Sequence, residues 1–376
     1  MEGPRPLKPE EFGSLCELVN SVFRPNGAGR METQYPLLFA PENFDHLLVM
    51  VENGRVVAHV GTLTREVSIL GHRLKSISIG AVATLPTHRG GGLATQLMKV
   101  AIQKGREEGS HLMLISGGRG LYRRLGATDA GLYARFNAHR SVLPSGPVDI
   151  ALATESEIPG LIRLYAHEPV RYIRSATDFH FNLHSKWNVD RGGELFTVSG
   201  KGTLLAYVAT QRPNPASSRE ANRVYLVELA GSRMAIAQAL PALIGWYGVD
   251  RVELITPVTD GDTARILSAY AVLPTLEGFP GTNLVLLPEQ FLTAFAPYIE
   301  AMLGPNRLKW HVSAEEITFT CEGQSLRVTA STLGQLWFGT VEPDSDPRLS
   351  LPVGPLREAL DWILPIQLPW CGLNYV

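Results

Sequence analysis

The chain has 376 residues, of which 45% are hydrophobic and 19% charged, and its formal net charge is -2. This length suggests two or three domains, and the apolar content is enough for each of them to bury a core. The small net charge argues against non-specific binding to nucleic acid. The sequence has no run of 18 apolar residues and no apolar signal core at its start, so we expect a cytoplasmic protein without a membrane partner.

The cysteines indicate neither a disulfide framework nor a metal site. Cys16, Cys321 and Cys371 are odd in number and scattered along the chain, which fits reduced thiols. Cysteine and histidine pairs at the spacing of zinc sites are missing as well. We therefore expect no metal.

Helix and strand patterns alternate in the first third of the chain, as in an α+β domain. The expected elements are a helix within residues 8–23, strands at 47–51, 56–60, 64–70 and 77–82, a helix from residue 93, and a strand at 111–116. A turn-rich stretch at 143–147 ends this pattern. We expect a first domain over residues 1–141.

A glycine-rich loop joins the strand at 77–82 to the following helix. The loop reads Arg89-Gly90-Gly91-Gly92 and runs straight into the apolar helical spacing that starts at Leu93. The first N–H groups of a helix have no partner inside it, and the helix dipole adds partial positive charge there. Glycines let the main chain approach an anion closely. The loop is therefore predicted to hold phosphate groups.

Three kinds of phosphate loop have this layout. A P-loop needs Gly-Lys-Ser/Thr, but Leu93-Ala94-Thr95 stands in that place. A dinucleotide fingerprint needs a third glycine where Thr95 lies, and an acidic residue after the next strand, which this chain lacks. The third pattern, Q/R-x-x-G-x-G/A, is filled by Arg89, Gly92 and Ala94. It resembles the acetyl-CoA loop of the GNAT family of N-acetyltransferases.

The middle of the chain repeats part of this order, and the last part is a smaller α+β segment. The expected elements are strands at 148–152, 224–229 and 251–256 with helices at 158–165 and 235–247, then a helix at 291–302, strands at 316–320 and 325–328, and helices near 331–337 and 353–364. The middle segment lacks the Arg-x-x-Gly-x-Ala pattern. We expect residues 142–286 to form a degenerate GNAT-like domain that does not bind CoA, and residues 287–376 to form the third domain.

This arrangement resembles the enhanced intracellular survival (Eis-like) acetyltransferases, most closely at Val82–Leu93, at Gly120–Gly126 and at the C-terminus. The resemblance implies an α+β fold with tandem GNAT-like domains, each a mixed sheet flanked by helices. It also implies a C-terminal α+β domain similar to sterol carrier protein, and a closed homo-oligomer, a trimer or a hexamer.

The same resemblance implies residue roles. Tyr122 lies in the Tyr-x-x-Leu-Gly motif whose tyrosine is the family's general acid, and the carboxylate of Val376 takes the place of the family's base. Relatives end in an aromatic residue where Val376 stands. Acetyl-CoA is the expected co-substrate. Its expected contacts are Val82, Ala83, Thr84, Arg89, Gly90, Gly91, Gly92, Leu93 and Ala94.

The sequence indicates the acceptor less specifically than it indicates the donor. Glu32, Glu42 and Asp45 lie where GNAT enzymes shape the acceptor site, and they favour a small cationic amine such as an aminoglycoside or a polyamine. A lysine or peptide acetyltransferase and a non-catalytic acyl-CoA-binding module stay open as alternatives. Ser116, at the end of its strand, is expected either to orient Tyr122 or to cap the strand.

Overall fold

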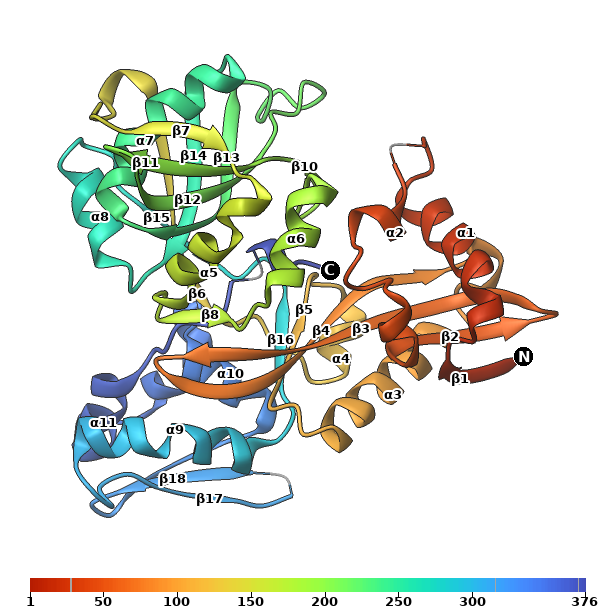
Figure 1. Ribbon diagram of the computed structural model, residues 1–376. Coiled ribbons are helices and arrows are strands. Elements are labelled where there is room, and N and C mark those ends of the chain that lie inside the picture. The colour runs from red at the N-terminus through yellow and green to blue at the C-terminus, as the bar shows by residue number, and fades with distance from the viewer. Residues whose placement is uncertain (28, 315, 371) are drawn as a thin grey trace. The chain divides into compact units, whose positions relative to one another are not determined.

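A computed structural model describes residues 1–27, 29–314, 316–370 and 372–376 (Figure 1). The fold is mixed α+β, as expected from the sequence. The chain divides into two compact units. The first unit comprises Met1–Gly131, Gly278–Leu368 and Val376, and the second comprises Leu132–Glu277 and Pro369–Tyr375. Among the helices in these described ranges, none combines the length and the apolar character that a membrane crossing requires.

The main sheet of the first unit runs in the order β1-β2-β3-β4-β5-β16. The pair β4–β5 is parallel, and the other neighbouring pairs are antiparallel. The strands are β1 (Glu2–Pro6), β2 (Leu47–Glu52), β3 (Arg55–Ile69), β4 (His72–Thr84), β5 (Leu112–Ile115) and β16 (Thr282–Val285). The helices beside this sheet are α1 (Phe12–Phe23), α2 (Met31–Gln34), α3 (Leu93–Glu107) and α4 (Gly120–Arg124). The two strands expected at 56–60 and 64–70 are one continuous strand, β3.

Helix α3 is held on the sheet by its apolar face. Leu93, Leu97, Met98, Ala101 and Ile102 recur at helical spacing and are buried in one cluster with residues of β2, β4 and β5. Full burial of a Leu, Ile or Met side chain contributes roughly 1.5–3 kcal/mol. The sequence spacing thus fixes which side of α3 faces the sheet and leaves its first turn at the end of the glycine-rich loop.

The last part of the first unit contains a small sheet, β17-β18-β19, and three helices. The elements are α9 (Pro288–Leu303), β17 (Lys309–Val312), β18 (Ile317–Cys321), β19 (Gln324–Val328), α10 (Ala330–Phe338) and α11 (Pro355–Ile363). Its core is aromatic: the ring of Phe291 lies 5.2 Å from that of Phe295 and 5.6 Å from that of Trp337. Such edge contacts between rings stabilise a core beyond the area they bury.

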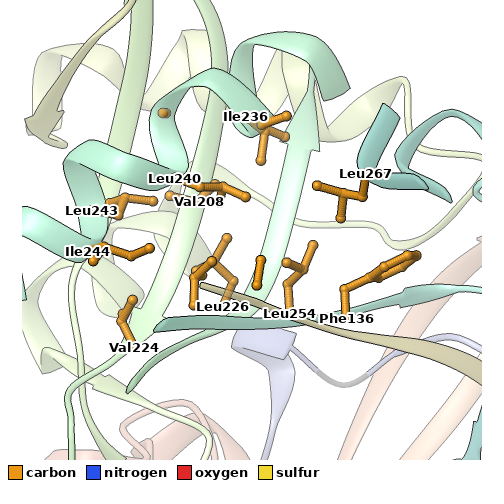
Figure 2. Packing of buried hydrophobic residues seen from close by; sticks show 14 of the residues in the cluster. Phe136, Val208, Val224, Leu226, Ile236, Leu240, Leu243, Ile244, Leu254 and Leu267 are labelled. Carbon is orange, nitrogen blue, oxygen red and sulfur yellow. The ribbon is translucent and has the colours of Figure 1, made fainter. Parts of the chain in front are cut away.

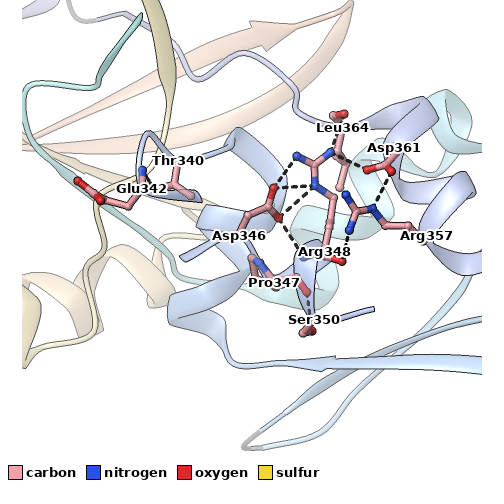
Figure 3. Close-up of polar contacts among 9 residues, drawn as sticks. All are labelled: Thr340, Glu342, Asp346, Pro347, Arg348, Ser350, Arg357, Asp361 and Leu364. Carbon is pink, nitrogen blue, oxygen red and sulfur yellow. Dashed lines mark hydrogen bonds and ion pairs between the residues drawn. The ribbon is translucent and has the colours of Figure 1, made fainter. Parts of the chain in front are cut away.

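A polar network ties α11 to the loop before it (Figure 3). Arg348 pairs with Asp346 and donates from Nη1 to the carbonyl of Leu364 at 3.0 Å. Asp361 accepts from Arg348 at 3.3 Å and from Arg357 at 2.6 Å. The Leu364 carbonyl follows the last turn of α11, so the arginine satisfies a group that the helix leaves without a partner. The network fixes the point from which the C-terminal tail departs.

The second unit is a seven-stranded sheet in the order β15-β6-β14-β13-β12-β11-β7, with helices packed on it. Its elements are β6 (Leu132–His139), β7 (Asp149–Leu152), α5 (Ile158–Ala166), β8 (Val170–Tyr172), α6 (Ala176–Ser185), β9 (Trp187–Asn188), β10 (Arg191–Gly192), β11 (Leu195–Gly200), β12 (Thr203–Gln211), β13 (Arg223–Gly231), α7 (Arg233–Tyr247), β14 (Arg251–Pro257), α8 (Gly261–Ser268) and β15 (Thr275–Gly278). Figure 2 shows α7 side chains such as Leu240 and Ile244 facing Leu226 of β13 and Leu254 of β14. The strands β13 and β14 are parallel and joined through α7, the same order as β4, α3 and β5.

Each of the two large sheets contains a strand from an unexpected part of the chain. The strand β6, placed in the first domain by the sequence analysis, pairs with β14 from His139–Arg251 to Tyr133–Pro257. The strand β16, placed in the middle domain, pairs with β5. The compact units therefore follow strand pairing rather than consecutive segments. The three-part division at residues 141 and 286 stays a prediction.

Candidate active site

Strand β4 bulges where it passes the end of β5. Ala81 has a φ of +50°, and the register between β3 and β4 shifts at this point. Pairing between β4 and β5 ends at Ile79 and Ile115, whereas β4 continues to Thr84. A bulge bends a strand and often marks a functional site. Three of the expected cofactor residues, at 82–84, lie on this stretch beyond the last β4–β5 pair.

The glycine-rich loop follows the bulged strand through a short 3-10 helix, Pro86–His88. Gly90 and Gly92 have φ values of +85° and +74°, a region that glycine enters at little cost. A side chain at either position would meet nothing within 4 Å, so both face open space. Arg89 is exposed, and its Nε donates to the Thr84 carbonyl at 3.3 Å. The loop therefore presents main-chain groups and one guanidinium.

Helix α3 starts without a side-chain cap. Gly92 is the N-cap residue and no acidic residue lies in the first turn. The first main-chain bond across this end runs from the Gln96 N–H to the Gly92 carbonyl at 3.1 Å. The N–H groups of Leu93 and Ala94 are thus left for an external acceptor, at the positive end of a 15-residue helix. This geometry suits a pyrophosphate.

Tyr122 lies on α4, the helix that follows β5 in the chain. Its side chain is only 5% exposed, and burial raises the pKa of its phenol, an effect that the positive charge of Arg119 partly opposes. The ring lies beside Gly117, whose added Cβ would be 3.5 Å from ring atom Cε2. Within the described part of the chain the hydroxyl makes no hydrogen bond. The side chain is thus a protonated phenol whose O–H group is available to donate a hydrogen bond or a proton.

Val376 is buried at the end of β5 within the first unit. Its side chain is 8% exposed, and Ser116 Oγ donates to a Val376 oxygen at 3.1 Å. Gly80 is the other contact: a Cβ there would lie 2.5 Å from the carboxyl carbon of Val376. The Val376 carboxyl group therefore lies directly against the Cα of Gly80, on β4 just before the bulge.

The residues just before Val376 are held within the second unit by a buried ion pair. Arg174 and Glu228 form a two-point contact at 2.6 and 2.7 Å, with exposed side-chain fractions of 1% and 7%. Glu228 also accepts from the Leu373 N–H at 3.1 Å, and Arg174 donates to Asn374 Oδ1 at 3.2 Å. The Trp370 indole donates to a carbonyl of β13 at 2.6 Å. Cys371 lies outside the described residues.

The three carboxylates proposed for the acceptor differ in surroundings. Glu32 accepts from Asn20 at 2.9 Å and pairs with Arg30. Burial raises its pKa, but these contacts outweigh burial and the pKa is lowered. Glu42 and Asp45 lie on the exposed face of a 3-10 helix, Pro41–His46. The negative charge of Glu32 is thus already paired with Arg30. Glu42 and Asp45 are the more accessible negative charges.

In the second unit, the junction between β13 and α7 is built differently from the glycine-rich loop. Ser232 caps α7 by accepting from the Ala235 N–H at 3.3 Å. Arg233 binds Glu168 at 2.6 Å and Asp260 at 2.8 Å. A cavity of about 740 Å³ opens here, lined in part by these residues. Its carboxylates disfavour a phosphate ligand, because like charges repel.

Comparison with known proteins agrees with the geometry of the first unit. Residues 4–130 match the family model described as acetyltransferase (GNAT) domain. That range includes the bulged strand, the glycine-rich loop and Tyr122. The chain is therefore an enzyme of the acyltransferase class, with a GNAT acetyltransferase domain over residues 4–130.

Several solved structures are similar over almost the whole chain. A probable N-acyltransferase of unknown function from Enterococcus faecalis V583 is 15% identical, with a TM-score of 0.67 and 97% of each chain covered. A GCN5-related N-acetyltransferase from Kribbella flavida is 17% identical, with a TM-score of 0.64, and 96% of this chain and 97% of that chain covered. Eis1 from Mycobacterium abscessus is 16% identical, with a TM-score of 0.62 and coverage of 97% and 98%. At these identities the likeness concerns the fold. No curated protein sequence matches the chain.

Three features of the two units were not predicted from the sequence. Gly80 was not singled out, because only the close approach of Val376 gives it a role. Ser116 was expected to orient Tyr122 or to cap the strand, whereas its hydroxyl binds Val376. Arg174 and Glu228 carried no local signal, since charged residues far apart in the sequence are exposed by default. An acidic residue in the apolar strand Val224–Leu229 was the one visible irregularity.

Proposed function

We propose that the protein is an acetyl-CoA-dependent N-acetyltransferase that acetylates a primary amine of a small cationic acceptor, aminoglycoside-like or polyamine-like. Transfer is by direct attack, with Tyr122 as general acid and the Val376 carboxylate as base. The observation that carries this proposal is the hydrogen bond from Ser116 to the buried Val376, at the end of the strand that leads to Tyr122. The GNAT domain then has a proton donor, Tyr122, and a proton acceptor, Val376, and amine acetylation requires both.

The base acts on the acceptor. An alkylammonium has a pKa near 10 and must lose a proton before its nitrogen can attack. The ionised form of the Val376 carboxyl group is the form that can accept this proton. Its charge attracts the ammonium and takes the proton directly or through water. Holding amine and thioester together supplies much of the remaining rate.

The acid acts on the leaving group. The amine nitrogen bonds to the thioester carbon, the C–S bond breaks, and the CoA thiolate takes the proton of the Tyr122 hydroxyl. The raised pKa of this buried phenol keeps it protonated until that step. After the C–N bond forms, the nitrogen loses its second proton, which restores the Tyr122 hydroxyl, while the first proton passes from Val376 to solvent. General acid catalysis of this kind contributes roughly 10²–10⁴-fold.

The donor is proposed to lie along the bulged strand and the loop. The N–H groups of Val82 and Thr84 pair with the pantetheine arm, and that of Val82 also polarises the thioester carbonyl. The pyrophosphate lies at the start of α3, against Arg89 and the main chain of the glycine-rich loop. The remaining contacts are Ala83, Gly90, Gly91, Gly92, Leu93 and Ala94. The open space at Gly90 and Gly92 supports this placement.

The other parts of the chain are proposed to follow the Eis-like pattern. The fold likeness to Eis1 over almost the whole chain supports this assignment. The second unit acts as a degenerate GNAT-like domain without CoA, which the capped start of α7 and the pair formed by Glu168 and Arg233 support. The segment 287–376 acts as the sterol-carrier-protein-like domain, and the protein forms a closed oligomer.

Two other functions stay as candidates. A lysine or peptide acetyltransferase would use the same donor and the same Tyr122, and the accessible Glu42 and Asp45 would then face a basic peptide. A non-catalytic acyl-CoA-binding module would bind CoA but would not depend on Val376. The close fit between Gly80 and Val376 favours catalysis over simple binding.

The test is thiol release from acetyl-CoA with aminoglycosides, polyamines and lysine peptides as acceptors. We expect turnover with a polycationic small molecule. Tyr122→Phe should lower kcat by at least roughly 10²-fold without changing the Kd of acetyl-CoA. Addition of one glycine after Val376 should have a similar effect, because it moves the carboxylate. CoA binding without thiol release from any of these amines would favour the binding module, and turnover with peptides alone would favour the second alternative.

A further inference from the structure

A cluster of three possible metal ligands lies in the second unit, apart from the residues assigned to acetyl transfer. It consists of Glu155, from the 3-10 helix Glu155–Glu157, and of His180 and His184, both on α6. Their ligand atoms all lie within 4.8 Å of one another, and all three side chains are exposed. We propose that these residues form a Zn²⁺ site.

The spacing of the ligand atoms agrees with zinc geometry. His184 Nε2 lies 3.1 Å and His180 Nδ1 lies 3.5 Å from Glu155 Oε1. Zinc binds nitrogen and oxygen ligands at about 2.0–2.2 Å, which places two ligands of a tetrahedral ion roughly 3.3–3.5 Å apart. The His180 distance thus matches the edge of a zinc tetrahedron, and the His184 distance is slightly shorter than such an edge. Histidines four residues apart lie on one face of a helix, and the carboxylate comes from a separate element.

The orientation of His184 is an independent argument for a cation. Its Nδ1 lies 2.8 Å from the His180 carbonyl, and since a carbonyl only accepts, Nδ1 carries the proton. In the neutral ring, Nε2 then presents a lone pair to the oxygen of Glu155. Either a metal ion or a proton on Nε2 satisfies this contact at 3.1 Å. Metal-binding histidines show this same arrangement, with the second ring nitrogen donating to a backbone carbonyl.

The site would join two elements of the second unit. The ion would link the segment at the start of α5 to the last turn of α6. Three protein ligands leave a fourth position to water, as in open zinc sites. A ligand that binds only the folded state stabilises it by RT ln(1 + [L]/Kd), so zinc should raise the melting temperature of the protein. The sequence did not predict this site, because the two histidines are not paired with cysteines and the carboxylate lies 25 residues before His180.

The experiment is a zinc titration of the full-length protein without an affinity tag, followed by calorimetry. His184→Ala and His180→Ala are compared with a matched control, His167→Ala. His167 is also exposed and its Nδ1 bonds the carbonyl four residues earlier at 2.7 Å, but it is not part of the three-residue cluster. We expect one tight equivalent of Zn²⁺ in the wild type and in the control, and at least 10-fold weaker binding at that site in the other two.

Two further readouts complete the test. Co²⁺ in place of Zn²⁺ should give visible absorption bands of a low-coordinate site in the wild type, which Glu155→Gln weakens. Because the three side chains are exposed, the variants should keep the metal-free melting temperature. Equal zinc stoichiometry and affinity in the wild type and in the His180→Ala/His184→Ala double variant would overturn the proposal. The cluster would then be an ion pair closed by a proton on His184.

Discussion

Ser116 Oγ and a carboxylate oxygen of Val376 lie 3.1 Å apart, although 260 residues separate them in the chain. Ser116 also lies 3.5 Å from the Ile79 carbonyl, so one hydroxyl at the end of β5 faces both β4 and the last residue. A hydrogen bond to a charged group is worth roughly 1.5–3 kcal/mol. The relationship suggests that Ser116 positions the proposed base.

Ser116→Ala should therefore lower kcat by roughly 10- to 100-fold, the range that corresponds to loss of such a bond. The Kd of acetyl-CoA should not change, because the pyrophosphate and pantetheine contacts lie elsewhere. Steady-state kinetics and calorimetry measure the two quantities. Ser76→Ala is the matched control, since Ser76 also bonds a carbonyl, that of Arg65 at 3.2 Å. Equal kcat values for both variants would contradict the positioning role.

Gly80→Ala should displace the Val376 carboxylate, because the new Cβ would lie 2.5 Å from its carboxyl carbon. We expect kcat to fall at least roughly 10-fold and the tail to become sensitive to carboxypeptidase. Gly13→Ala is the control, since a Cβ there meets nothing within 4 Å. Unchanged turnover in Gly80→Ala would show that the position of the carboxylate does not limit catalysis.

The pH dependence of kcat tests Tyr122. Burial raises the pKa of this phenol above its ordinary value of about 10, so it remains a proton donor throughout the alkaline range in which the amine deprotonates. The rate should rise between about pH 7 and pH 9.5 without a descending limb below pH 10. Tyr122→Phe should show the same rise at a much lower rate. A loss of activity between pH 8 and pH 9 would mean that a different acid is at work.

The ion pair of Arg174 and Glu228 predicts a non-additive double-mutant cycle. Arg174→Met leaves Glu228 as a buried unpaired charge, which should cost roughly 3–5 kcal/mol. Arg174→Met combined with Glu228→Leu should cost less than Arg174→Met alone, because no charge stays buried. Urea denaturation measures the free energies of unfolding. Additive effects would mean that the two side chains do not stabilise each other.

His59 predicts how stability changes in acid. The side chain is fully buried in β3, and burial lowers its pKa from 6.5 to about 4, while a contact with the Leu48 carbonyl at 3.0 Å partly opposes the shift. The folded state thus binds fewer protons than the unfolded state, so stability is full above pH 6.5 and is lost as the pH falls towards 4.

At about 1.4 kcal/mol per pKa unit, this single group accounts for roughly 3 kcal/mol of that loss. His59→Asn should be less stable at pH 7, but its free energy of unfolding should fall less between pH 6.5 and pH 4. Urea titrations at the two pH values measure the difference. Parallel losses in wild type and variant would place the acid sensitivity on other groups.

Local sequence patterns predicted much of the fold. The helix spacing that begins at Leu93 and the apolar strand before it produced α3 and β4 at the expected places, because hydrophobic period and turn residues act over short distances. The glycine-rich loop was identified in the same way. Of its two left-handed glycines, Gly90 and Gly92, only Gly92 stands at a position that the pattern specifies.

Contacts between distant segments could not be predicted in this way. The sequences of β6 and β16 do not indicate which strands they pair with. The same holds for Ser116 with Val376 and for Arg174 with Glu228. Each of these residues has its role only through a partner far along the chain. The local sequence around it therefore does not reveal that role.

The pairing of β5 with β16 also has a consequence for biosynthesis. As the nascent chain leaves the ribosome, β5 emerges long before β16, and domains generally fold from the N-terminus as they are made. Until β16 arrives, one side of β5 is a bare strand edge, which invites pairing with other chains. Maturation of the acetyltransferase domain therefore has to wait for most of the polypeptide, and a fragment that stops at residue 131 should aggregate rather than act.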